Sequence, residues 1–92
     1  MKILYPMTGE TMNYKFNEGQ LIQEVQAYID GTYGEHYASD KYQATDIIID
    51  SGHGEGFTLG NIMKYAKRYG NKDGKNRKDL LKILHYGIIM LN

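Results

Sequence analysis

The sequence contains no cysteine, no tryptophan and only one proline among its 92 residues. Without cysteine, neither a disulfide nor a thiolate zinc site can stabilise the fold, and the chain suits a reducing compartment. A single domain of this size buries only about two-thirds of its unfolded surface, so its stability as a monomer is modest. Oligomerisation is the remaining way to bury more surface. We therefore expect one domain, over residues 1–92, that forms a homo-oligomer.

Long apolar runs are absent as well. No stretch approaches the ~18 residues that a membrane-spanning helix needs. The N-terminal segment has one lysine and a short apolar stretch broken by Pro6, which is not the pattern of a signal peptide. The sequence thus predicts a cytoplasmic protein that does not bind membranes.

Two common kinds of ligand site are also missing. No glycine-rich stretch ends in Gly-Lys-Ser or Gly-Lys-Thr, so the phosphate-binding loop of many nucleotide enzymes is excluded. His53 lies between Asp50 and Glu55, but the spacing is too loose to predict a metal site, and a hydrogen-bonded loop residue is the simpler interpretation. We expect no metal and no cofactor.

Charge is divided unevenly along the chain, although the net charge is zero. Residues 1–56 hold nine acidic residues and three lysines, a balance of −6, whereas residues 57–92 hold eight basic and two acidic residues, a balance of +6. Either the two halves neutralise each other, within one fold or between copies, or the second half binds an anion. The chain therefore divides into an arm over 1–16, an acidic half over 17–56 and a basic helical hairpin over 57–92.

The spacing of apolar residues predicts a mostly α-helical domain with helices over 17–30, 41–51, 58–69 and 76–91. Asn17 suits the start of the first helix and Gly31 its end, with a loop over 32–40. The second span is ambiguous, because the isoleucines at 47–49 also suit a strand; we favour a helix because Ala44 and Asp46 are poor strand residues. The glycines of 51–56 predict a turn. Within the arm, residues 2–5 could form a short strand.

The last two helices are expected to pack as an antiparallel hairpin, because the link over 71–75 is only about five residues long. Thr58 suits the N-cap of the first and Asn76 that of the second. The helix over 76–91 is apolar nearly all round, which places it in the interface of the oligomer. In the helix over 58–69, the residues expected to face the core are Leu59, Ile62, Met63, Ala66 and Tyr69.

A candidate anion site lies on the opposite side of the same helix. Asn61, Lys64 and Arg68 fall at offsets of zero, three and seven, so they share one stripe. Arginine binds phosphate with two parallel hydrogen bonds, and lysine adds a point charge. Gly60 would let a ligand approach, the nearby helix N-terminus would offer free N–H donors, and Tyr65 could stack on a base. The alternative is an ordinary solvated face of charged residues.

The sequence also resembles a known family through His36-Tyr37, Phe57-x-x-Gly60-Asn61-x-x-Lys64-Tyr65-x-x-Arg68, and Asp79-Leu80-x-Lys82 with Tyr86. These motifs are similar to a small-protein family found widely in bacteriophages, with a domain of unknown function labelled SaV-like or nucleotide kinase-like. The resemblance covers about residues 36–92. It implies contact with a nucleotide, and a location in the host cytoplasm if the chain is phage-encoded. The site residues it implies are His36, Tyr37, Gly60, Asn61, Lys64, Tyr65, Arg68, Asp79 and Lys82.

Three functions follow as hypotheses. The first is a nucleotide-binding protein that sequesters a nucleotide or a nucleotide-derived signal at a subunit interface, as a means of evading host defence. The second is a nucleoside monophosphate kinase without a phosphate-binding loop. The third is an interaction module for a protein or a nucleic acid, although zero net charge argues against nucleic acid.

Overall fold

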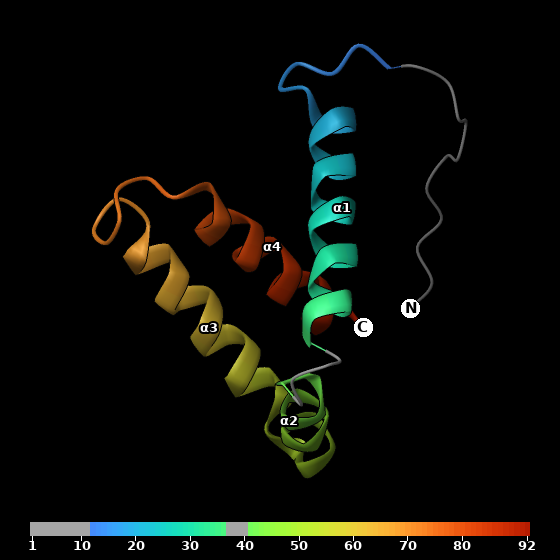
Figure 1. Ribbon diagram of the computed structural model, residues 1–92, viewed down its shortest axis with the longest axis vertical. Helices are drawn as coiled ribbons and strands as arrows, with labels where there is room; N and C mark the ends of the chain where they lie inside the picture. The colour runs from blue at the N-terminus through green and yellow to red at the C-terminus, as the bar shows by residue number, and fades with distance from the viewer. Residues whose placement is uncertain (1–11, 37–40) are drawn as a thin grey trace.

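The computed structural model describes residues 12–36 and 41–92, and within these ranges the regular structure is helical, with no strand. The predicted fold class is therefore confirmed, while the strand proposed over 2–5 lies outside the described residues (Figure 1). The elements in chain order are α1 (Glu18–His36), α2 (Lys41–Ile48), the π-helical turn η1 (Ile49–His53), α3 (Gly54–Arg68) and α4 (Arg77–Leu91).

Helices α3 and α4 form the predicted antiparallel hairpin (Figure 1). The link turns at two glycines with positive φ, Gly70 (84°) and Gly74 (69°), and the Gly70 N–H donates to the Gly74 carbonyl over 2.9 Å. Glycine adopts this left-handed backbone without steric cost. Asn76 caps α4 as predicted, because its side-chain oxygen accepts a hydrogen bond from the Lys78 N–H over 2.9 Å.

Aromatic rings fill the interface between these two helices. Tyr86 of α4 makes an edge-on contact with Phe57, with centroids 5.9 Å apart, and stacks on Tyr65 with centroids 6.3 Å apart. Tyr65 is 8 % exposed and is the one buried hydrophobic residue in the described part of the chain. Aromatic pairs in these geometries contribute about 0.5–1.5 kcal/mol beyond their buried area. The hairpin is thus held by a row of three rings.

The predicted core face of the helix over 58–69 is wrong in part. Leu59, Met63 and Ala66 are exposed, the first two at 47 % and 63 %, whereas Ile62 and Tyr69 are half-buried. The buried residues of α3 are Thr58 and Tyr65. The prediction of Thr58 as N-cap is also wrong, because α3 begins at Gly54 and the Thr58 hydroxyl donates to the Gly54 carbonyl over 2.9 Å within the helix.

Helix α1 packs beside α4 through polar and aromatic side chains. The Arg77 guanidinium donates to both carboxylate oxygens of Glu24, and His85 makes an edge-on contact with Tyr28 at a centroid distance of 6.2 Å. The acidic and basic halves of the chain therefore meet in one ion pair here. This pair is solvent-exposed, so it fixes geometry more than it adds stability.

Two predicted boundaries need correction. Helix α1 does not end at Gly31 but continues to His36, so the first part of the predicted loop over 32–40 is helical; residues 37–40 lie outside the described part. Thr32 is buried in this extension, and its hydroxyl donates to the Ile29 carbonyl over 2.7 Å. Helix packing has therefore outweighed the cost of about 1 kcal/mol that a helical glycine carries.

Residues 51–56 do not form the predicted turn; in this stretch the chain passes from one helical element to the next. Helix α2 runs to Ile48, which excludes the strand alternative over 47–50, and η1 then leads directly into α3. The direction of the chain changes at Gly52, the one residue of η1 with non-helical dihedral angles (φ 90°, ψ 8°). The change of direction thus needs only Gly52, in the left-handed backbone conformation, and not the loop that the three glycines had suggested.

Gly52→Ala should destabilise the protein by about 1–2 kcal/mol, because a Cβ is unfavourable at positive φ. Gly56→Ala is the matched control: it lies in the first turn of α3 with no atom within 4 Å of an added Cβ, and should stabilise by about 0.5–1 kcal/mol. Urea unfolding followed by circular dichroism measures both. Equal effects at the two positions would contradict the hinge at Gly52.

Candidate functional site: a cationic cluster on the helical hairpin

Three cationic side chains surround the ring of Tyr65. The Lys64 and Lys82 ammonium nitrogens lie 4.6 Å and 4.7 Å from its centroid, and the Arg68 guanidinium carbon lies 5.1 Å away. Lys64 and Arg68 come from α3, whereas Lys82 comes from α4. The antiparallel hairpin therefore brings together residues that are far apart in sequence, and we call these four residues the cationic cluster.

The charges of the cationic cluster are not balanced by acidic side chains. Within residues 12–36 and 41–92, no carboxylate forms an ion pair with any of the three cations. The nearest acidic neighbour on α4, Asp79, is 2 % exposed, and its Oδ2 has no hydrogen-bond partner among the described residues. Each cation–ring contact contributes about 0.5–1 kcal/mol, but three like charges around one ring repel each other. An anion in this place would remove that repulsion.

The cluster changes the acidity of Tyr65. Burial alone would raise the pKa of its phenol, but the charges of Lys82 and Lys64 and hydrogen bonds from both lysines outweigh burial, so the pKa is lowered below the ordinary value for tyrosine. The same field that favours a phenolate would favour any other oxyanion held between these lysines.

Tyr65 should therefore ionise at a lower pH than an ordinary tyrosine in an alkaline titration of the protein. Because the folded-state pKa is lowered, the contribution of Tyr65 to stability is fully present above the unfolded pKa and is lost as pH falls through the folded pKa. Tyrosinate absorbance should show an early step in the wild type. Tyr65→Phe should lack this step, while Tyr33→Phe on α1 should retain it; an unchanged curve for Tyr65→Phe would contradict the assignment.

The structure gathers four of the predicted site residues but not the rest. Asn61 donates its side-chain amide to the Phe57 carbonyl of its own helix over 2.9 Å. Gly60 is exposed and has no atom within 4 Å of an added Cβ, so nothing in the fold requires a glycine there. His36 is the last residue of α1. Its side chain and the whole of Tyr37 lie outside the part of the chain that the structure describes. Of the predicted site residues, the cationic cluster therefore brings together Lys64, Tyr65, Arg68 and Lys82.

Two features of the predicted site are wrong in detail. The helix N-terminus is not near Gly60 and Asn61, because α3 begins at Gly54 and both residues lie in its interior. Arg68 is half-buried rather than opposite the core, so the cluster borders the α4-facing side of α3. Sequence reasoning also missed how Tyr86 stacks behind Tyr65; its position four residues after Lys82, on the same side of α4, was the available signal.

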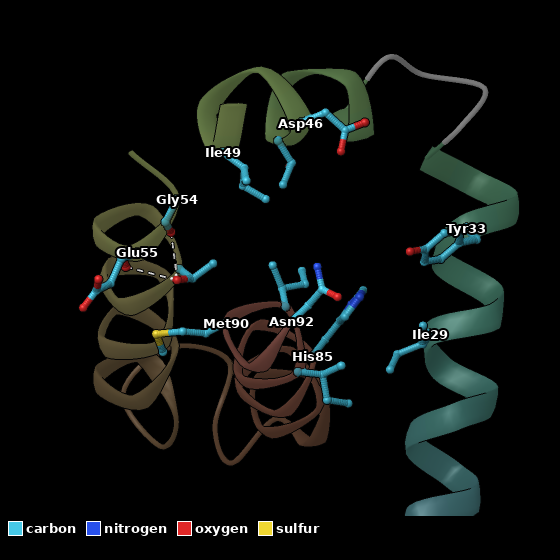
Figure 2. Close-up of a pocket in the computed structure, with 13 residues that line it drawn as sticks. Ile29, Tyr33, Asp46, Ile49, Gly54, Glu55, His85, Met90 and Asn92 are labelled. Atoms are coloured by element: carbon cyan, nitrogen blue, oxygen red, sulfur yellow. Dashed lines mark hydrogen bonds between the residues drawn. The ribbon is translucent and has the colours of Figure 1, made fainter. Parts of the chain in front are cut away.

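A pocket separate from the cationic cluster lies where the four helices meet (Figure 2). This pocket has a volume of about 910 Å³, and His85 points into it from α4 beneath α2. Periodicity gave no signal for it, because its walls come from every helix of the described chain. Its lining includes Ile29 and Tyr33 of α1, Asp46 of α2, and His85, Ile88 and Ile89 of α4.

Neither a metal site nor a membrane span is found in the described part of the chain. No group of three or more His, Cys, Asp or Glu side chains there is placed to hold a metal ion. None of the described helices is long and apolar enough to cross a membrane.

Comparison with known families places this hairpin inside a recognised domain. Residues 32–87 match the family described as "protein of unknown function (DUF3310)". The match covers more than half of the chain and includes all four residues of the cationic cluster. No curated protein and no solved structure matches the chain.

Proposed function

Because the chain belongs to the DUF3310 family, whose function is unknown, we propose its function from the cationic cluster: it binds a nucleotide through its phosphate. The observation that carries this proposal is the convergence of three cations, from two helices, on the ring of Tyr65 with no carboxylate paired to them in the described chain.

The chemistry of the three cations suits a phosphate group. Arg68 can donate two parallel hydrogen bonds to one phosphate, while Lys64 and Lys82 add two positive charges within 5 Å of the centre of the ring. Tyr65 stacks on Tyr86 and is nearly buried, so its role is to hold the cations in place rather than to stack on a base. Binding would relieve repulsion already present in the free protein.

The similarity to phage proteins with a nucleotide kinase-like domain supports a nucleotide as the ligand. On this proposal the protein sequesters its nucleotide in the cytoplasm of an infected host cell. Phosphoryl transfer is the alternative that the same resemblance suggests, but no feature of the described residues favours it over binding. An interaction with an acidic protein or a nucleic acid is the second alternative, since it would use the same cations.

Calorimetry against mono-, di- and cyclic nucleotides tests the proposal. We expect saturable binding of at least one nucleotide, weakened at pH values above the Tyr65 pKa because the phenolate repels the phosphate. Absence of binding across the panel would contradict the proposal. Conversion of a nucleoside monophosphate with ATP and magnesium would instead support the kinase alternative, and salt-dependent binding of DNA without nucleotide binding would support the interaction module.

A further inference from the structure

Helix α4 carries an apolar stripe that neither α3 nor α1 covers. Leu80, Leu84, Gly87 and Leu91 recur at spacings of four, three and four residues, which is the spacing of a coiled-coil seam. Leu84 and Leu91 are 50 % and 87 % exposed, and Leu80 is exposed as well. At 100° per residue, the stripe lies about a third of a turn from the side of α4 that faces α3.

The fold gives a reason why this stripe should have a permanent partner. In the described part of the chain, Tyr65 is the one buried hydrophobic residue, and no cysteine is available for a disulfide. A domain with so small a core gains stability mainly by burying further apolar surface against another molecule. A second copy of the chain is the partner that is available wherever the chain is synthesised.

We propose that two copies pair through α4 in an antiparallel arrangement. A two-fold interface must be self-complementary, and residues 83–92 contain no charged side chain that could oppose its own copy. This observation is separate from the cationic cluster, which lies on the side of α4 that faces α3.

Charge decides between the two orientations of the helices. The first turns of α4 carry Arg77, Lys78 and Lys82 and one acidic residue, Asp79, whereas the rest of the helix, residues 83–91, holds no Lys, Arg, Asp or Glu. A parallel pair would bring the two basic ends together. An antiparallel pair places each basic end beside the C-terminal end of the other helix, where the helix dipole favours positive charge.

The antiparallel register follows from the shape of the stripe. Pairing Leu80 of one copy with Leu91 of the other places Leu84 opposite Gly87 twice, on either side of the two-fold axis. No atom lies within 4 Å of a Cβ added at Gly87, so the space above it is open. The half-exposed Leu84 of the second copy would fill that space, as a knob fills a hole in a coiled coil.

The absence of native cysteine makes this register directly testable by cross-linking. Leu80→Cys and Leu91→Cys variants, mixed and oxidised, should form a disulfide-linked dimer that contains one copy of each. Neither variant alone should cross-link, because in this register each engineered cysteine lies about 16 Å along the helix axis from the same cysteine in the other chain. Cross-linking of either variant alone would overturn the antiparallel arrangement. Absence of cross-linking together with a monomer mass in sedimentation would overturn the dimer.

A charge-neutral swap tests the pairing of Leu84 with Gly87. Gly87→Leu adds apolar surface, yet it should abolish the dimer, because two leucines would then occupy the same space. Combining it with Leu84→Gly should restore the dimer, since the knob and the hole have only changed places. Circular dichroism confirms that each variant is folded. A tighter dimer for Gly87→Leu alone would overturn this register.

Discussion

Arg68→Ala is expected to weaken nucleotide binding roughly 10- to 150-fold, the effect of losing about 1.5–3 kcal/mol from a charge-assisted bidentate contact. The expectation follows from the position of Arg68, 5.1 Å from the Tyr65 ring and beside two lysines that point at the same place. The stability of the protein should change little, because removing one of three repelling cations offsets the lost ring contact. Calorimetry and urea unfolding measure the two quantities separately.

Two variants control for this result. Arg68→Lys keeps the charge but loses the planar fork, so it should recover only part of the affinity. Arg77→Ala removes an exposed arginine of the same hairpin that lies outside the cluster and pairs with Glu24, so it should leave affinity near the wild-type value. Equal affinity for Arg68→Ala and the wild type would remove the phosphate site and leave an ordinary solvated face. Equal losses for Arg68→Ala and Arg77→Ala would indicate a general effect of net charge.

Tyr86→Ala should destabilise the fold by about 2–4 kcal/mol, somewhat below the usual cost for a fully buried aromatic residue because Tyr86 is half-buried. Its ring contacts both Phe57 and Tyr65, so its loss removes both of these ring contacts between the two helices. For a domain whose total stability is on the order of 5–15 kcal/mol, this is a large fraction. Urea unfolding should show an earlier midpoint, and Tyr86→Phe should retain most of the stability.

Met63→Ala is the matched control for the packing argument. Met63 belongs to the face that periodicity assigned to the core, but it is 63 % exposed, so its replacement should change stability by less than about 0.5 kcal/mol. If Met63→Ala proved more damaging than Tyr86→Ala, the stripe of Leu59 and Met63 would face α4 after all, and the aromatic row would be wrong.

Local signals in the sequence were sufficient for α4 and for the hairpin. The cap at Asn76 and the glycines of the link act within a few residues of each other, so their meaning does not depend on the rest of the fold. The face of α3 could not be predicted in the same way. Leu59 and Met63 satisfy a helical period as well as Phe57 and Tyr65 do, and only the presence of Tyr86 on α4 decides between the two faces.

The candidate site also contains one part that local sequence spacing could predict and another that depends on the tertiary fold. Lys64 and Arg68 flank Tyr65 on one helix, so their proximity could be predicted from spacing alone. The approach of Lys82 depends on the register between α3 and α4, which no local pattern fixes, and the motif resemblance was the signal that pointed to it. The pocket beside His85 needed the placement of four helices at once and gave no sequence signal.

The order of the helices along the chain has a consequence during synthesis. Helix α1 packs on α4, but Glu24 and Arg77 are separated by 53 residues. At the usual rate of elongation, α1 leaves the ribosome roughly 3–10 s before the helix that it contacts. The ion pair and the Tyr28–His85 contact can form only after that delay, whereas α3 and α4 emerge together and can join at once. We therefore expect the hairpin to fold first. Helix α1 has many polar side chains, so it can remain exposed to solvent until α4 is available to pack against it.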